Sequence, residues 1–370
     1  MNTRVYIRPI GFTPGPQAEH GNAVRLAGGM VYASRFAVIL REGGAVTQRW
    51  LAAPDTISEL LGRLPDGVGA EAEAQWAALR TAHPPLALAG RTIRLDQPQV
   101  MGILNLTPDS FSDGGRFTSP DAARSEAAAM LEAGAAILDI GGESTRPGAK
   151  PVWEGDEIAR VAPAIAAAAA MGAAVSIDTR KAAVMEAALD TGAAMVNDVS
   201  GLKHDPRSAS VIAARGCPVV LMHAPGAGGE DLHAGGDYGN VVLDVFDYLR
   251  ARRDAALTAG IARENILLDP GIGFGKTLAA STALIAALPL FHALGQPLLL
   301  GASRKRLIGA LSNEAPADQR LGGSLALALA AMDAGVQLHR VHDVAETVQA
   351  RNVWRGLRDA ALTDFSDLPD

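Results

Sequence analysis

The sequence predicts an α/β fold, a (β/α)8 or TIM barrel, preceded by a small α+β extension. From about residue 100 onward, short apolar and often β-branched runs alternate with Ala- and Leu-rich helical stretches. This alternation is typical of parallel strands joined by crossover helices. Eight such runs can be counted, which favours a closed barrel over an open sheet. They cover residues 100–104, 136–140, 174–177, 194–196, 218–222, 266–268, 297–300 and 337–341.

Helix signals fall between these runs, where a barrel needs them. Ser119 offers an N-cap, and Pro120 follows it at the first helical position. Gly134 and Gly192 mark expected helix ends before the next strand.

The first 84 residues do not share the repeating pattern. They predict a strand at residues 5–7, an extended apolar run at 32–40, and a helix that begins at a capping box formed by Thr56 and Glu59. We assign this extension no function.

A domain boundary is expected at residues 83–85, because the proline pair there disfavours a helix. The predicted parts are therefore the extension, 1–84, and the barrel, 85–370. The stretch 86–95, around Gly90 and Arg91, predicts a hairpin that covers the bottom of the barrel.

Composition excludes several classes of protein. The formal net charge of -7 argues against a nucleic-acid partner, which requires clustered Lys and Arg. No segment has the pattern of a signal peptide, and apolar runs such as 164–174 are too short to span a bilayer. The lone Cys217 cannot form an internal disulfide, so we expect a cytoplasmic protein.

Polar residues follow nearly every predicted strand. Because the active site of a (β/α)8 barrel lies at the C-terminal ends of its strands, these side chains should converge. They are Asn105, Asp139, Asp178, Asn197, Asp198, Met222, His223, Asp269, Ser303, Arg304, Lys305, Arg340, His342 and Asp343.

Four of these residues suit a flat heterocycle with several hydrogen-bonding groups. The Asp178 and Asp269 carboxylates can accept from ring N–H and amino groups, while Asn197 and Lys305 can donate to ring oxygen or nitrogen. Any one of them alone could instead cap a helix or form an Asx turn. Their convergence favours a ligand, since isolated buried charges are costly.

A second cluster is expected to be cationic. Arg146, Arg340 and His342, joined by Asn105, could hold an anionic leaving group, because barrels often bind phosphate after strands seven and eight. The alternative is a set of surface salt bridges at helix starts.

Two loops have the composition of substrate lids. Residues 107–115 and 141–148 combine glycine with charged groups, which is unusual for plain connectors. The stretch 271–277 resembles the end of a nucleotide-binding P-loop, but Pro270 stands where the first glycine of that motif is required. We therefore expect a turn that brings backbone close to the ligand.

The assembled motifs resemble those of the dihydropteroate synthase family. MGILNLTPDSFSDGG (101–115) and LDIGGESTRPGA (138–149) are similar to its two signatures. SIDTRK, NDVSGL, LMH, LLDPGIGFGK, GASRK and RVHDVAET follow in the expected order, and the resemblance covers residues 86–357. It implies a transferase of folate biosynthesis, which condenses 6-hydroxymethyl-7,8-dihydropterin diphosphate with p-aminobenzoate to give 7,8-dihydropteroate and diphosphate.

The resemblance also implies a role for each site residue. Asp178, Asn197, Asp269 and Lys305 correspond to the pterin site, with Met222 packing on the ring and Asp139 nearby. Asn105 corresponds to a Mg2+ ligand, and Arg340 with His342 to the anion site. The residues near p-aminobenzoate correspond to Phe111, Thr145, Arg146, Pro147 and Ser303, while Asp113 lies in a lid. The family further implies a homodimer that sulfonamides inhibit.

Some residues depart from the family pattern. A glycine-rich loop follows His223, Gly239 and Asn240 replace residues that are usually acidic, and Arg180 replaces a smaller or uncharged residue. These changes put loop conformation and affinity in question.

Two other functions fit the motifs less well than a synthase does. A methyltetrahydrofolate:corrinoid methyltransferase would not need the TPDSFSDGG, STRPG and SRK motifs. A non-catalytic pterin-binding paralogue would be expected to lose Asn105, Arg146, Lys305 or Arg340, and all four are present.

Overall fold

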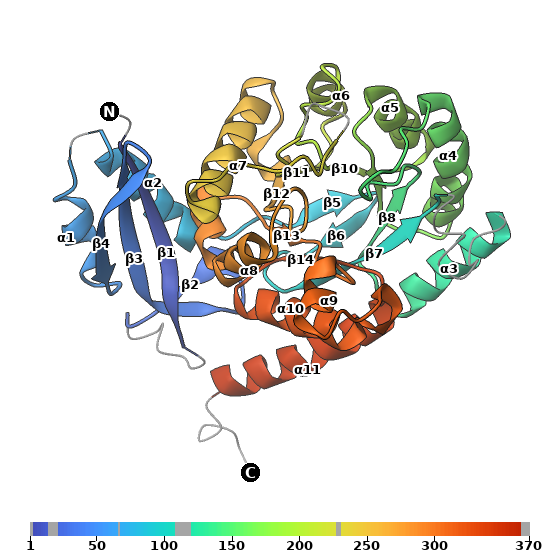
Figure 1. Ribbon diagram of the computed structural model, residues 1–370. Helices are drawn as coiled ribbons and strands as arrows, with labels where there is room; N and C mark the ends of the chain where they lie inside the picture. Colours follow the sequence, from blue (N-terminus) through green and yellow to red (C-terminus); the bar gives the residue numbers. More distant parts are fainter. Residues whose placement is uncertain (1–2, 14–20, 66, 108–119, 227–230, 364–370) are drawn as a thin grey trace, which may run out of the picture.

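The computed structural model describes residues 3–13, 21–65, 67–107, 120–226 and 231–363. Their centre is an eight-stranded sheet of parallel strands surrounded by helices (Figure 1). The strands are β7 (Gln99–Asn105), β8 (Ile137–Gly141), β9 (Val175–Asp178), β10 (Met195–Asp198), β11 (Val219–Met222), β12 (Ile266–Asp269), β13 (Leu299–Leu300) and β14 (Leu338–Val341). Each of the eight predicted runs overlaps one of them, so the predicted barrel is confirmed.

The sheet closes between β12 and β13. Its hydrogen-bonded order is β12-β11-β10-β9-β8-β7-β14-β13. A bridge between Leu268 and Leu298, and a 2.9 Å hydrogen bond from the Leu268 N–H to the Pro297 carbonyl, join its two ends. The carboxyl ends of all eight strands therefore face one mouth.

Helices alternate with the strands around the barrel. They are α3 (Pro120–Glu132), α4 (Glu154–Ala170), α5 (Ala182–Thr191), α6 (Ser208–Arg215), α7 (Val241–Thr258), α8 (Leu278–Ala286), α9 (Arg306–Leu311), α10 (Leu321–Asp333) and α11 (Val344–Leu362), with 3-10 turns η4 (Arg263–Asn265), η5 (Leu288–Leu294) and η6 (Ala317–Gln319). As predicted, α3 begins at Pro120 and α5 ends directly before Gly192. Ser119, the expected N-cap, lies outside the described residues.

A hairpin closes the bottom of the barrel, as predicted. Strands β5 (Leu86–Leu88) and β6 (Arg91–Ile93) pair antiparallel. Apolar side chains of this hairpin pack against those at the N-terminal ends of the barrel strands, including Met101. The hairpin residues are Leu86, Leu88, Ile93 and Leu95. That end of the barrel is therefore sealed with apolar contacts.

The N-terminal extension forms an antiparallel sheet with two helices. Its elements are β1 (Thr3–Thr13), β2 (Val24–Arg25), η2 (Leu26–Gly28), β3 (Tyr32–Glu42), β4 (Ala45–Ala52), α1 (Ile57–Leu61) and α2 (Gly69–Arg80). The predicted strand and apolar run lie on β1 and β3. The Gln75 side chain joins α2 to β1, because it accepts from the Ile7 N–H (2.9 Å) and donates to the Val5 carbonyl (2.7 Å).

The predicted capping box at Thr56 does not form. Helix α1 starts where expected, but the Thr56 backbone is already helical (φ -107°, ψ -14°), and its side chain makes no cap hydrogen bond. The Thr56 hydroxyl instead accepts from the Ala53 N–H at 3.1 Å. A capping side chain needs an extended backbone to reach the N–H groups of the first turn, and this turn does not provide one.

The extension packs on η5 and α7 of the barrel, and Figure 1 shows it on the side of the barrel near α7. Tyr6 of β1 contacts Phe246 of α7 edge to face, with ring centroids 5.3 Å apart, and both belong to one hydrophobic cluster. The two predicted parts therefore share a core. Among the described residues, no helix combines the length and apolar character needed to cross a bilayer.

Candidate active site

Strand register brings the predicted polar residues to one level of the barrel. Asp178 on β9 pairs with Gly141 on β8 and with Asn197 on β10. Asn105 on β7 is also a register partner of Gly141. These three side chains therefore lie on neighbouring strand ends, as expected for a mouth built from several strands.

Arg340 lies at the centre of this group. Its Nε donates to Asp139 Oδ2 at 2.5 Å, and its Nη2 donates to Asp178 Oδ2 at 2.7 Å. The Asn197 amide donates to the same Asp139 oxygen at 3.0 Å. Within the described part of the chain, the other Asp139 oxygen is buried without a hydrogen-bond partner. The mouth thus presents an acceptor that a ligand N–H could satisfy.

Asp269 and Lys305 form the opposite side. Asp269 Oδ1 accepts from the Gly271 N–H at 2.7 Å, and the Lys305 ammonium donates to the Ile272 carbonyl at 2.6 Å. Gly271 has a φ of +68°, and a Cβ there would lie 1.9 Å from the His223 carbonyl oxygen. A tight glycine turn is therefore present after β12, packed against the His223 backbone, and only glycine fits it; its approach to a ligand stays a prediction.

The charges of these residues are strongly affected by burial. Burial raises the pKa of Asp178 above its usual range, although Arg340 opposes this. It raises the pKa of Asp269 as well, against the Gly271 N–H and Lys305. The pKa of Lys305 falls to about 8, because burial outweighs the attraction of Asp269. Shifts of this kind, on several groups in one cleft, are typical of functional sites.

The second cluster differs from the prediction in its charge. The pKa of His342 falls to about 3, because it is buried and faces Arg340, Arg304 and Arg146. His342 is therefore neutral near pH 7, and it lies with its Nδ1 3.1 Å from the Ser303 hydroxyl. These surroundings do not favour the positive charge expected on His342, and Arg340 is paired with the carboxylates of Asp139 and Asp178.

The remaining predicted residues surround the mouth. Met222 belongs to a small apolar cluster with Val199, Ala224, Leu232 and Phe274. The loop after β8 carries Thr145, Arg146 and Pro147, of which the last two are exposed. Phe111 and Asp113 lie outside the described residues.

Three residues at the mouth were not predicted. Phe274 lies beneath the Lys305 ammonium, which is 4.1 Å from its ring centroid. His233 stacks on Phe274, and Leu232 is buried beside it. The sequence carried a signal for Phe274 alone, because an aromatic residue stands inside a glycine-rich turn after a strand. It carried none for His233 or Leu232.

Two of the residues that depart from the family pattern, Arg180 and Asn240, have local partners. Arg180 is buried, with its Nε 3.4 Å from Glu143 Oε2, and Lys181 contacts the same carboxylate. Asn240 caps α7, because its side chain accepts from the Leu243 N–H at 3.2 Å.

Lys276 does not behave as a P-loop lysine. Its ammonium donates to the carbonyls of His223, Gly271 and Phe274, at 3.2, 2.7 and 3.0 Å. It therefore holds the turn after β12 in place.

Comparison with known proteins identifies the family. The model of the pterin binding enzyme family matches residues 101–342, which include Arg340, Lys305 and the strands that carry Asp139, Asp178 and Asp269. The chain belongs to this family. Within it, the similar proteins are dihydropteroate synthases, as the motifs predicted.

Relatives in this pterin-binding family match nearly the whole barrel. Dihydropteroate synthase of Haemophilus influenzae is 42% identical over 271 residues, covering 73% of this chain and 98% of the relative. A probable bifunctional folylpolyglutamate synthase/dihydropteroate synthase of Haloferax volcanii is 48% identical over 264 residues, 71% of this chain but only 31% of that relative. The Xanthomonas albilineans dihydropteroate synthase structure with 4-aminobenzoic acid matches with a TM-score of 0.70 and 45% identity, covering 78% of this chain and all of that one.

Proposed function

We propose that the chain is a dihydropteroate synthase, which transfers the pterinylmethyl group of 6-hydroxymethyl-7,8-dihydropterin diphosphate to the amino group of p-aminobenzoate. The observation that carries this proposal is the cluster of Asp139, Asp178, Asn197 and Arg340 facing Asp269 and Lys305 across one barrel mouth. Membership of the pterin-binding family supports it.

The pterin ring would bind between the two sides of the mouth. Asp178 and Asp269 would accept from ring N–H and amino groups, and Asn197 and Lys305 would donate to ring acceptors. Met222 would pack on the ring with its apolar neighbours. Arg340 holds Asp178 through a charged hydrogen bond, so it would orient that carboxylate toward the ring.

The second substrate would lie under the loop after β8. Thr145, Arg146 and Pro147 lie on that loop, and Ser303 lies opposite beside His342. We assign Phe111 and Asp113 to this substrate from their motif alone. The Arg146 guanidinium would bind the carboxylate of p-aminobenzoate or the departing diphosphate, both of which are anions.

Mg2+ is the metal we expect, held at Asn105. The residues present fit such a weakly held ion: Asn105 offers a single amide oxygen near Asp178, and Mg2+ in phosphate-transfer sites is often held mainly by the substrate. Within the described ranges, no group of three or more His, Cys, Asp or Glu side chains could hold a metal alone. When bound, Mg2+ would neutralise charge on the diphosphate.

The reaction is a substitution at the pterin methylene carbon. A C–N bond forms from the aniline nitrogen, the C–O bond to diphosphate breaks, and the nitrogen loses one proton. The Asp178 and Asp269 carboxylates would stabilise positive charge that develops on the pterin, while Arg146 and Arg340 would stabilise the departing anion, with His342 as a neutral hydrogen-bonding partner. An amine needs no strong base here, so orientation supplies much of the rate.

The direct test is release of diphosphate by the purified protein. We expect release only when both the pterin diphosphate and p-aminobenzoate are present, with 7,8-dihydropteroate as the other product. Release without p-aminobenzoate would indicate a hydrolase instead. Sulfonamides should compete with p-aminobenzoate, because neither substrate loop carries an obvious insertion; a noncompetitive or absent effect would contradict that part.

A homodimer is also proposed. Exposed apolar side chains lie on neighbouring helices: Leu311 on α9, Leu321 on α10, and Val353 and Leu357 on α11. Large apolar side chains exposed in this way favour burial against a second copy. Sedimentation of the protein should give twice the chain mass, and Leu357→Glu should shift it toward the monomer. A cytoplasmic location stays a prediction from the sequence.

A further inference from the structure

The segment after β11 reaches across the mouth to the loop after β8. His233 Nε2 lies 2.7 Å from the Thr145 carbonyl oxygen. A carbonyl oxygen only accepts, so Nε2 carries the hydrogen and donates it. The neutral Nε2–H tautomer is sufficient for this bond. His233 is thereby tied to the loop that carries Arg146 and Pro147.

The other side of this histidine contacts the pterin side of the mouth. Its ring stacks on Phe274, with centroids 5.0 Å apart and planes inclined by 16°. Phe274 in turn contacts the Lys305 ammonium at 4.1 Å. Thr145, His233, Phe274 and Lys305 therefore form one continuous chain of contacts from the loop after β8 to the start of α9.

Local structure holds His233 in this position. Its own N–H donates to Asp231 Oδ1 at 2.8 Å, and the preceding Leu232 is 5% exposed within the apolar cluster at the mouth. The Gly236 N–H donates to the Gly275 carbonyl at 3.3 Å. A Cβ on Gly275 would lie 2.5 Å from the Ala234 carbonyl oxygen, so the two loops approach more closely than another residue would allow.

We propose that His233 is a positioning residue, which fixes the loop after β8 at a set distance from Phe274 and Lys305. This proposal rests on the proposed function, and it assigns His233 a role in placing p-aminobenzoate against the bound pterin. The residue does not touch the reacting atoms. It sets the place of the loop whose Thr145, Arg146 and Pro147 would contact the second substrate.

Two variants separate the contacts that His233 makes. His233→Phe keeps a ring to stack on Phe274 but removes the donor to Thr145, whereas His233→Gln keeps an N–H donor. We expect His233→Phe to raise KM for p-aminobenzoate about tenfold, the effect of one hydrogen bond. KM for the pterin diphosphate and kcat should change less than threefold, and His233→Gln should recover most of the loss.

Tyr238→Phe is the matched control. It removes a hydroxyl from the same segment, and that hydroxyl is buried without a hydrogen-bond partner among the described residues. Its kinetics should equal those of the unchanged protein. The positioning role would be overturned if His233→Phe lowered kcat and raised both KM values by similar factors. It would also be overturned if none of these values changed.

Hydrogen exchange provides a readout independent of activity. In His233→Phe, the amides of residues 142–152 should exchange about tenfold faster than in the unchanged protein, because the loop has lost its anchor. Tyr238→Phe should leave their exchange unaltered. If the unchanged protein makes no dihydropteroate, the proposed function fails, and exchange in this loop still decides whether His233 anchors it. Unchanged exchange in His233→Phe would refute the anchor.

Discussion

The two ends of the barrel are made by the same eight strands but have opposite chemistry. At the bottom, the strands begin with buried apolar side chains, and the hairpin of β5 and β6 covers them. These side chains are Met101, Ile137, Ala174, Met195, Val220, Leu267, Leu299 and Leu338. At the mouth, the same strands end in Asn105, Asp178, Asn197 and Asp269, with Arg340 among them.

This difference separates stability from function along each strand. Apolar burial at the bottom is favourable in proportion to its area and needs no partner of particular geometry. Burying carboxylates at the mouth is unfavourable, as the raised pKa values of Asp178 and Asp269 indicate. The mouth therefore keeps costly groups that a ligand can use, and the closed bottom stabilises the structure that holds them.

Removal of Asp178 should have the largest effect on activity. We expect Asp178→Ala to lower kcat/KM roughly 1,000-fold, because it removes a ring acceptor and frees Arg340 to form other contacts. The fold should persist, since Arg340 retains Asp139. Steady-state kinetics and circular dichroism check both parts. Asp190→Ala, an exposed ion-pair partner of Arg215 on the helix that follows, is the control and should keep full activity. Near-normal turnover in Asp178→Ala would end the pterin assignment.

A cavity at the bottom of the barrel should lower stability and leave activity unchanged, which is the opposite of the effect expected for Asp178→Ala. Leu88 is fully buried in the hairpin. Leu88→Ala should lower the free energy of unfolding by about 2–4 kcal/mol, while kcat/KM at a temperature where the protein is folded stays unchanged. Denaturant unfolding measures the first, and the diphosphate assay the second. Thr92→Ala, on the exposed face of the same hairpin, should cost less than about 0.5 kcal/mol. If Leu88→Ala lowered activity of the folded protein, the two ends would not be independent.

Regular features of the barrel were predictable because they depend on local patterns. The eight strands followed from apolar runs, and the hairpin from the turn at Gly90 and Arg91 within the stretch 86–95. The convergence of Asp178, Asn197 and Asp269 followed from topology alone, since parallel strands end on one face.

Side-chain partners were not predictable in the same way. The pairing of Arg340 with Asp139 and Asp178 depends on which side chains reach the same depth across the barrel, and sequence spacing does not encode that depth. The neutral state of His342 depends on burial beside arginines from other loops. Thr56 failed as a cap because its own backbone is helical, a consequence of the turn before it.

The alkaline limb of the pH profile of kcat/KM tests whether the charge of Lys305 is needed for activity. Lys305 lies among Asp269, Asp178 and Arg340, and burial lowers its pKa to about 8. Its ammonium form would bind the pterin, so kcat/KM should fall about tenfold per unit as the pH rises above that value. Lys305→Arg should be less active but lose this limb, because arginine stays charged. A limb that persists in Lys305→Arg would instead belong to another group, and Lys276, with a pKa lowered to about 7, is the nearest candidate.

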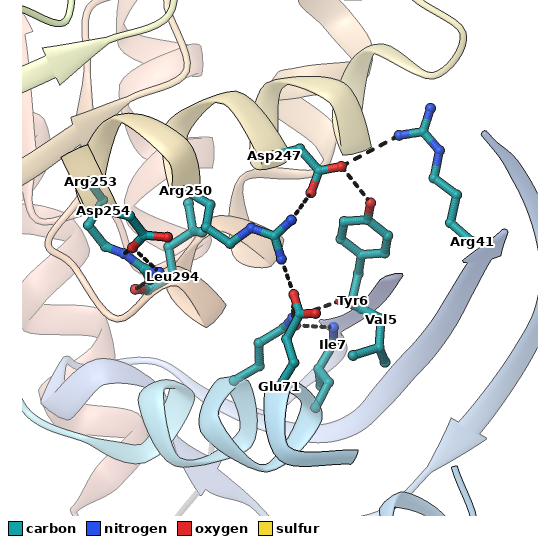
Figure 2. A network of polar contacts seen from close by, with 11 residues as sticks. Val5, Tyr6, Ile7, Arg41, Glu71, Asp247, Arg250, Arg253, Asp254 and Leu294 are labelled. Atoms are coloured by element: carbon teal, nitrogen blue, oxygen red, sulfur yellow. Dashed lines mark hydrogen bonds and ion pairs between the residues drawn. The ribbon is translucent and has the colours of Figure 1, made fainter. Parts of the chain in front are cut away.

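The smallest effect is expected where the extension meets the barrel, on the side of the molecule away from both ends. Figure 2 shows Asp247 of α7 at the centre of this contact: it accepts from the Tyr6 hydroxyl at 2.8 Å and from Arg250 at 2.9 Å, with Arg41 at 3.8 Å. Arg250 also pairs with Glu71 of α2.

Asp247→Asn keeps the shape and a hydrogen-bond acceptor but removes the charge. Because the Asp247 side chain is 28% exposed, solvent screens these pairs, and we expect a loss of about 1 kcal/mol in the free energy of unfolding. Activity should not change, since none of these residues lies at the mouth. Glu59→Gln, in an exposed pair with Arg63, is the matched control and should be near neutral. A change in KM for either substrate in Asp247→Asn would mean that the extension affects the mouth through α7. Stability and function would then be separate between the two ends of the strands, but not between the extension and the barrel.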